Sequence, residues 1–126
     1  MNKERLIILA DYLQTLPPEN LDMHSWTCGT AACAVGHACT LPEFKAEGFS
    51  LHTDSVCNYP ALKLTFHETL TGWNAVVKFF SLNRRAAYYL FDFISYVGDP
   101  SPTYVSDRIR AYVINGSAVN TDGGTI

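Results

Sequence analysis

Residues 30–40 read TAACAVGHACT, a segment in which almost every side chain is small. Such a segment is typical of a helix that other parts of the chain approach closely. Gly36 near its middle costs a helix about 1 kcal/mol relative to alanine, and close packing can offset that cost. Thr27 or Thr30 is placed to act as the N-cap, and Pro42 ends the helix. The segment therefore predicts a central, enclosed helix at about 30–40.

Two amphipathic helices with recognisable caps are expected near the two ends of the chain. The first covers 3–15 with Asn2 as its N-cap, and the second follows Ser101, has Pro102 in its first turn and ends at Gly116. Apolar side chains recur every three to four residues in both, at Leu6, Leu9, Ala10 and Leu13 and at Val105, Ile109, Tyr112 and Val113.

The middle of the chain predicts further helices and one segment that is hard to assign. One helix begins at Gly72, with Val76, Phe79 and Phe80 on its core face, and Asn83 caps another, in which the apolar residues Ala87, Leu90, Phe91 and Ile94 recur. The sequence PEF at 42–44 indicates a short helical turn. Residues 49–66 alternate poorly, so short strands at 49–51 and 62–66 and an irregular loop both fit.

These patterns predict one mainly α domain, a compact bundle of four to five helices over residues 1–116. A small β-hairpin around 49–66 is left open, and 117–126 is expected to be a flexible C-terminal tail. A length of 126 residues suits a single domain, and 48% hydrophobic residues can supply its core.

The charge and composition of the chain limit the classes of binding partner and the cellular compartment that fit it. A net charge of −3 with dispersed basic residues argues against nucleic acid as the main partner. The sequence contains no run of about 20 apolar residues, so it predicts no membrane span. The N-terminal apolar run is interrupted by Asp11 and indicates a helix rather than a signal peptide. The four cysteines are therefore expected to be reduced, in the cytoplasm.

Cys28, Cys33 and His37 form the candidate metal cluster of the sequence. Cys33 and His37 are four residues apart, so one face of a helix could present both to one zinc ion. Zinc sites usually show two such ligand pairs, and only one is clear here. The competing interpretation is that the cysteines are small buried side chains and that His37 is a hydrogen-bonded core histidine. The sequence favours no metal and no other cofactor.

Cys28 is also a candidate nucleophile, because a helix N-terminus favours the thiolate form of cysteine. The turn TCGTAAC resembles the nucleophile turn of ubiquitin-like-protein proteases. In that family the partner histidine and aspartate come well upstream, and this chain has no matching segment before Cys28. No phosphate loop, G-x-S-x-G or H-E-x-x-H sequence is present either. The sequence therefore assigns no catalytic residue.

Aromatic residues are more frequent after residue 87 than a core of this size needs. Tyrosine is favoured at protein interfaces because it combines a large apolar area with a polar group. Tyr88 and Tyr89 are adjacent, so one of them must point away from the face set by Ala87, Leu90 and Phe91. Tyr88 and Tyr89 are therefore the predicted contact residues.

Several segments together resemble a family of small proteins of phages, prophages and their bacterial hosts. They are W-x-C-G-T-x-A-C-x-x-G-H-A at 26–38, PEF at 42–44, G-W-x-A-x-x-x-F-F-x-L at 72–82, A-x-Y-L-F at 87–91 and the closing segment 101–116. The resemblance implies a helical domain and a phage setting and gives no chemistry. Family members often have tryptophan in place of His37, which argues against a metal role for this residue.

The leading hypothesis is a non-enzymatic protein-interaction module, phage-encoded and binding or inhibiting a host protein such as a defence component. A small acidic domain suits a basic partner, because charge steers association. The alternatives are a small zinc-binding helical domain and a Cys28-dependent enzyme. Self-association through the aromatic residues is also open.

Overall fold

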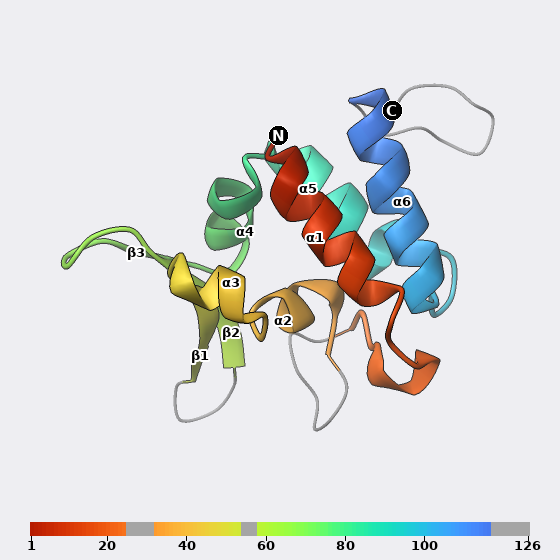
Figure 1. Cartoon of the computed structure of the whole chain (residues 1–126), viewed down its shortest axis with the longest axis horizontal. Coiled ribbons are helices and arrows are strands. Elements are labelled where there is room, and N and C mark those ends of the chain that lie inside the picture. Colours follow the sequence, from red (N-terminus) through yellow and green to blue (C-terminus); the bar gives the residue numbers. More distant parts are fainter. Residues whose placement is uncertain (25–31, 54–57, 117–126) are drawn as a thin grey trace.

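The computed structural model describes residues 1–24, 32–53 and 58–116. Within these ranges the chain forms six α-helices, two short 3₁₀ helices and three β-strands (Figure 1). The α-helices are α1 (Lys3–Leu13), α2 (Ala34–Ala38), α3 (Pro42–Ala46), α4 (Gly72–Phe80), α5 (Arg84–Phe91) and α6 (Pro102–Asn115). The 3₁₀ helices are η1 (Pro18–Asn20) and η2 (Phe93–Ser95), and the strands are β1 (Phe49–Thr53), β2 (Asn58–Lys63) and β3 (Thr69–Thr71).

The expectation of a mainly α bundle is wrong, because β1, β2 and β3 form an antiparallel sheet and make the fold mixed α/β. β2 lies in the middle of the sheet, and Phe49 of β1 is opposite its Leu62. On the other side Leu62 is opposite Leu70 of β3. The hairpin considered at 49–66 covers only β1 and β2. β3 has three residues, which is too short to show the alternation that identifies a strand.

Pro60 explains why β2 was difficult to identify from the sequence. Proline after asparagine and tyrosine is typical of a turn, yet Pro60 lies within β2, opposite Leu51 of β1. β3 pairs with residues 61–63 only, so at Pro60 the strand has β1 as its single paired neighbour. Proline lacks an amide hydrogen and is tolerated where one side of a strand has no ladder to complete.

α1 and α6 pack side by side, although they come from opposite ends of the chain (Figure 1). The Ser106 hydroxyl donates a 2.8 Å hydrogen bond to the Ala10 carbonyl, and both residues are fully buried. The predicted core faces are confirmed, since both helices bury apolar residues along one side: Leu6, Leu9, Ala10, Leu13, Val105, Ile109 and Tyr112.

The sheet packs against α3 and α4 through aromatic side chains. Phe44 of α3, Phe49 of β1, and Phe79 and Phe80 of α4 have no exposed surface. Gly48, directly before β1, makes the close approach of this end of β1 to β2 possible: its φ is +94°, and a Cβ there would lie 2.7 Å from the Lys63 carbonyl oxygen. Any side chain at this position would therefore push the two elements apart.

Local capping signals placed three of the six described α-helices correctly. Asn2, Asn83 and Ser101 each accept a hydrogen bond from a first-turn amide of α1, α5 and α6. Gly116 ends α6 with a φ of +72°. The caps therefore confirm the predicted starts of these helices and the predicted end of the last one.

The small-residue helix is buried as predicted, but it is shorter than 30–40. α2 covers only Ala34–Ala38, and its N-cap is Cys33 rather than a threonine. Thr27 and Thr30 lie outside the described residues. A cysteine sulfur is a weak acceptor and gives no capping signal in a sequence, so the sequence pattern starts this helix too early.

The helices are short. Among the helices that the structure describes, the longest is α6, with 14 residues. In the parts of the chain that the structure describes, no helix has both the length and the apolar character needed to cross a membrane.

Candidate functional site

The cysteine and histidine side chains proposed as metal ligands have structural partners in the fold. The Cys33 sulfur accepts a hydrogen bond from the Gly36 amide at 3.4 Å and caps α2. The His37 Nε2 donates to the Asn20 carbonyl at 2.6 Å. Cys28, the third member of the cluster and the candidate nucleophile, lies outside the described residues. Among the residues with described positions, no group of three or more His, Cys, Asp or Glu side chains could hold a metal ion.

A second sulfur atom contributes to the start of α2. The Met23 Sδ accepts a hydrogen bond from the Ala34 amide at 3.5 Å, and Met23 and Cys33 are both buried. Burial raises the pKa of the Cys33 thiol to about 11. The buried thiol therefore stays protonated at neutral pH, which suits packing and capping and not nucleophilic attack.

Cys33 makes folding stability depend on alkaline pH. Its thiol ionises in the unfolded chain at about pH 9 but resists ionisation in the folded state up to about pH 11. The stabilisation is complete below the unfolded pKa and is lost as the pH rises through the folded pKa. We expect this one group to remove about 2–3 kcal/mol of stability between about pH 9 and about pH 11.

Urea unfolding under reducing conditions across this pH range measures the effect. Cys33→Ser is the matched control, because serine keeps an N-cap acceptor and has no group that titrates there. Burial also raises the pKa values of Cys39 and Tyr96, so the variant should keep part of the alkaline loss. An identical pH dependence in both proteins would show that the Cys33 thiol does not contribute.

Outside the core, the segment after α5 exposes large apolar side chains. Phe93 is partly exposed, Ile94 is 77% exposed and Val97 is completely exposed. We call these three residues the loop patch. The sequence pattern predicted Ile94 on the core face of a continuing helix, and this is wrong because α5 ends at Phe91. The Asp92 side chain accepts from the Ile94 amide and starts η2 instead.

The loop that carries the patch is fixed to α6 by Arg108. The Arg108 Nη1 donates to the Tyr89 carbonyl at 2.9 Å and to the Ser95 carbonyl at 3.1 Å. The same guanidinium lies over three tyrosine rings, with its Cζ 3.8 Å from the ring centre of Tyr96, 4.4 Å from Tyr89 and 5.7 Å from Tyr104. Three of the seven tyrosines thus contact Arg108, a partner that the sequence did not indicate, and these contacts help to hold the loop.

Tyr96 strengthens the same arrangement from inside the protein. Its hydroxyl donates a 2.6 Å hydrogen bond to the Leu90 carbonyl, and its ring is buried. The Ser95 hydroxyl lies 2.8 Å from the Tyr89 carbonyl, so the turn is bonded back to α5 as well. The loop patch therefore sits on a segment with few conformations open to it.

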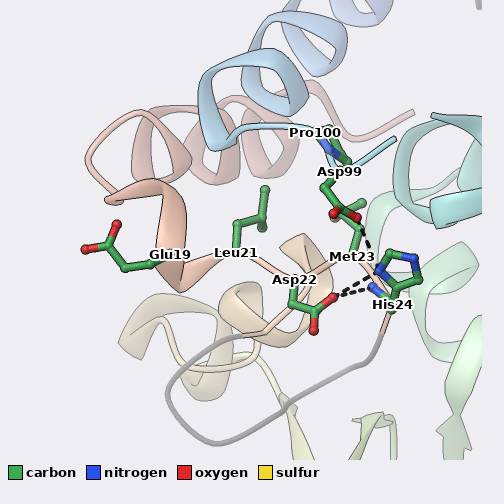
Figure 2. Close-up of a pocket in the computed structure, with 7 residues that line it drawn as sticks. All are labelled: Glu19, Leu21, Asp22, Met23, His24, Asp99 and Pro100. Atoms are coloured by element: carbon green, nitrogen blue, oxygen red, sulfur yellow. Dashed lines mark hydrogen bonds and ion pairs between the residues drawn. The ribbon is translucent and has the colours of Figure 1, made fainter. Parts of the chain in front are cut away.

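Beside the loop patch lies an acidic depression of about 390 Å³ (Figure 2). Three carboxylates, one imidazole and three apolar residues line it: Glu19, Asp22, Asp99, His24, Leu21, Met23 and Pro100. Figure 2 shows Asp22 and Asp99 both directed at the same edge of the His24 ring, whereas the Glu19 side chain lies at the other end of the depression and points away. The acidic groups are therefore spread along the depression.

His24 connects the depression to the loop patch. Its ring centre is 4.6 Å from that of Phe93. Its Nδ1 is 3.2 Å from Asp22 Oδ1 and 3.7 Å from Asp99 Oδ1. The backbone amide of His24 also donates to Asp22, and this hydrogen bond lowers the pKa of that carboxyl group. Asp22 is consequently ionised at neutral pH.

The tyrosines predicted as contact residues lie on α5. Tyr88 is partly exposed, packs edge-on against Trp73 with ring centres 4.9 Å apart and contacts Arg84 through its hydroxyl. Tyr89 is half-buried against the core and lies under Arg108. A contact role for either residue stays a prediction. The sequence pattern did not predict the loop patch. The signal that could have indicated it is Asp92, a residue type that often caps a new helical turn.

Comparison with protein-family models, with curated proteins and with solved structures gives no match to this chain. On the described residues, the loop patch and the acidic depression beside it are two surface features that the packing of the core does not explain.

Proposed function

We propose that this protein is a non-enzymatic interaction module that binds another protein through the loop patch. The observation that carries the proposal is the exposure of Phe93, Ile94 and Val97 on a loop that Arg108 holds in place. Clustered exposed apolar side chains are typical of interaction sites. A loop that is already ordered loses little conformational entropy when a partner binds.

The resemblance to the phage and prophage family extends the proposal. On this resemblance the protein is phage-encoded, acts in the host cytoplasm and binds or inhibits a host protein, for example a defence component. The setting names a class of partner and no contact residue. The loop patch is the surface to which we assign that contact.

The two alternative functions both depend on Cys28. A zinc domain would use it with Cys33 and His37, and an enzyme would use it as nucleophile. Cys28 lies outside the described residues. Cys33 and His37 are engaged in hydrogen bonds that hold α2. No observation on the described residues favours either alternative over the interaction module.

The proposal predicts that apolar contacts at the loop patch dominate binding. Peptides selected from a random library against the immobilised protein should bind at least tenfold more weakly to an Ile94→Asp/Val97→Asp double variant, a loss of about 1.4 kcal/mol or more. Titration by fluorescence anisotropy gives the dissociation constants. Chemical-shift changes at the amides of residues 93–99 identify the binding surface.

Ile114→Asp is the matched control, because Ile114 is 82% exposed on α6 and equally apolar. Its affinity for the same peptides should equal that of the unmodified protein. All these side chains are exposed, so each variant should unfold within about 0.5 kcal/mol of the unmodified protein. Selected peptides that bind the double variant with full affinity would show that the loop patch is not the binding site.

A further inference from the structure

We infer that the loop patch binds a protein segment that combines apolar residues with an arginine or lysine, and that the basic side chain enters the acidic depression. This inference rests on the proposed function and adds the chemistry of the partner. It is carried by two features that meet at one place, the apolar loop patch and the negative charge directly beside it.

The loop patch and the depression are continuous. Asp99 follows Val97 by two residues on the same loop, and Pro100 also lines the depression. On the other side, the His24 ring contacts Phe93. A partner that covers the apolar side chains therefore brings its neighbouring residues to the carboxylates.

The charge of the depression selects a cationic side chain. Glu19, Asp22 and Asp99 contribute carboxylates, and among the described residues that line it none is lysine or arginine. Among the described lining residues His24 alone can offset them, and its Nδ1 faces both Asp22 and Asp99. Asp99 is exposed, so its contribution will depend on ionic strength, as expected for charges in contact with solvent.

A side-chain cation fits this arrangement better than the other positively charged ligands. In the described ranges, no group of three or more His, Cys, Asp or Glu side chains could hold a metal ion. A guanidinium or ammonium group on a flexible chain can instead approach Asp22 or Asp99 in turn, and a guanidinium can also stack on an aromatic ring such as Phe93. Nucleic acids and anionic lipid surfaces would be repelled by the same carboxylates.

Charge-neutralising variants test the inference. In a peptide that requires Ile94 and Val97 for binding, replacing its basic residue by glutamine should weaken binding to the unmodified protein about three- to fivefold at low salt, as for exposed ion pairs. The same replacement should have little effect on binding to an Asp22→Asn/Asp99→Asn variant. Asparagine keeps the shape of each side chain and an acceptor oxygen while removing the charge. Glu43→Gln on α3 removes one charge outside the depression and should leave the affinities unchanged.

The outcomes separate this inference from the proposed function. Selected peptides that depend on Ile94 and Val97 but are rich in neutral or acidic residues would overturn the inference and leave the interaction module intact. The inference would also be overturned if replacing the basic residue of a peptide by glutamine weakened binding equally to the unmodified protein and to the Asp22→Asn/Asp99→Asn variant. Loss of all dependence on Ile94 and Val97 would instead contradict the proposed function. Sedimentation of the free protein adds one check: dimerisation through the loop patch would identify a second copy as its occupant and overturn the inference.

Discussion

Replacing Arg108 by alanine is expected to lower the free energy of unfolding by about 2–4 kcal/mol. The substitution removes a donor from the Tyr89 and Ser95 carbonyls, which lie in a part-buried environment. It also removes the cation that lies over Tyr96 and its two neighbouring rings. A charged donor that satisfies carbonyl groups contributes more than a neutral one, and desolvated cation–π contacts add to it.

Two further variants make the Arg108 prediction specific. Arg108→Lys keeps the charge but loses the planar fork that reaches both carbonyls, so its stability should fall between those of the unmodified protein and the alanine variant. Arg110→Ala removes the neighbouring arginine of α6, whose Nη2 contacts Asp11 and Gln14 at the surface. That loss should be below about 1 kcal/mol, as for most exposed ion pairs. Equal losses for Arg108→Ala and Arg110→Ala in urea unfolding would contradict the assigned role.

The role of Arg108 connects stability with the proposed binding surface. Without it, the amides of the segment around Ile94 should exchange with solvent faster, because the turn loses its attachment to α6. A looser loop patch must be ordered by the partner, so binding should weaken even in the folded fraction of the variant. Hydrogen exchange therefore measures how far Arg108 orders the loop, and peptide titration measures how far that order contributes to binding.

The features that could be predicted from the sequence are those fixed within one turn of the chain. Asn2, Asn83 and Ser101 each cap a helix through an amide three residues away, and such a signal can be identified without knowing the tertiary structure. The sheet depends on pairing between separate segments. β3 has one apolar residue, Leu70, and its place beside Leu62 follows from the tertiary fold rather than from any local pattern.

The candidate site was harder to predict for the same reason. Ile94 continues the helical spacing of α5, yet Asp92 captures its amide and starts a 3₁₀ turn. The surplus of tyrosines suggested an interface, and three of them surround Arg108 from α5, the following turn and α6. Glu19 and Asp99 are 80 positions apart in the sequence and line one depression only because the chain folds back. No spacing rule identifies such a site.

Phe79→Ala is expected to destabilise the protein by about 3–5 kcal/mol, the range for a large aromatic side chain removed from a core. The ring of Phe79 stacks on that of Phe49 with centres 4.2 Å apart, and the ring of Phe44 meets it edge-on at 4.9 Å. The substitution therefore opens a cavity at the junction of α3, α4 and the sheet. Arg5, whose Cζ lies 4.1 Å from the ring centre, loses its aromatic contact as well.

Two phenylalanine variants decide whether this loss comes from packing. Phe66 is 91% exposed at the turn between β2 and β3, so Phe66→Ala removes the same atoms without opening a cavity and should change stability by less than about 0.5 kcal/mol. Phe79→Leu refills most of the space and should recover more than half of the alanine loss. Urea unfolding at constant m-value measures all three. A small loss for Phe79→Ala would mean that α4 can shift to close the cavity, and the sheet would then not be held by this aromatic contact.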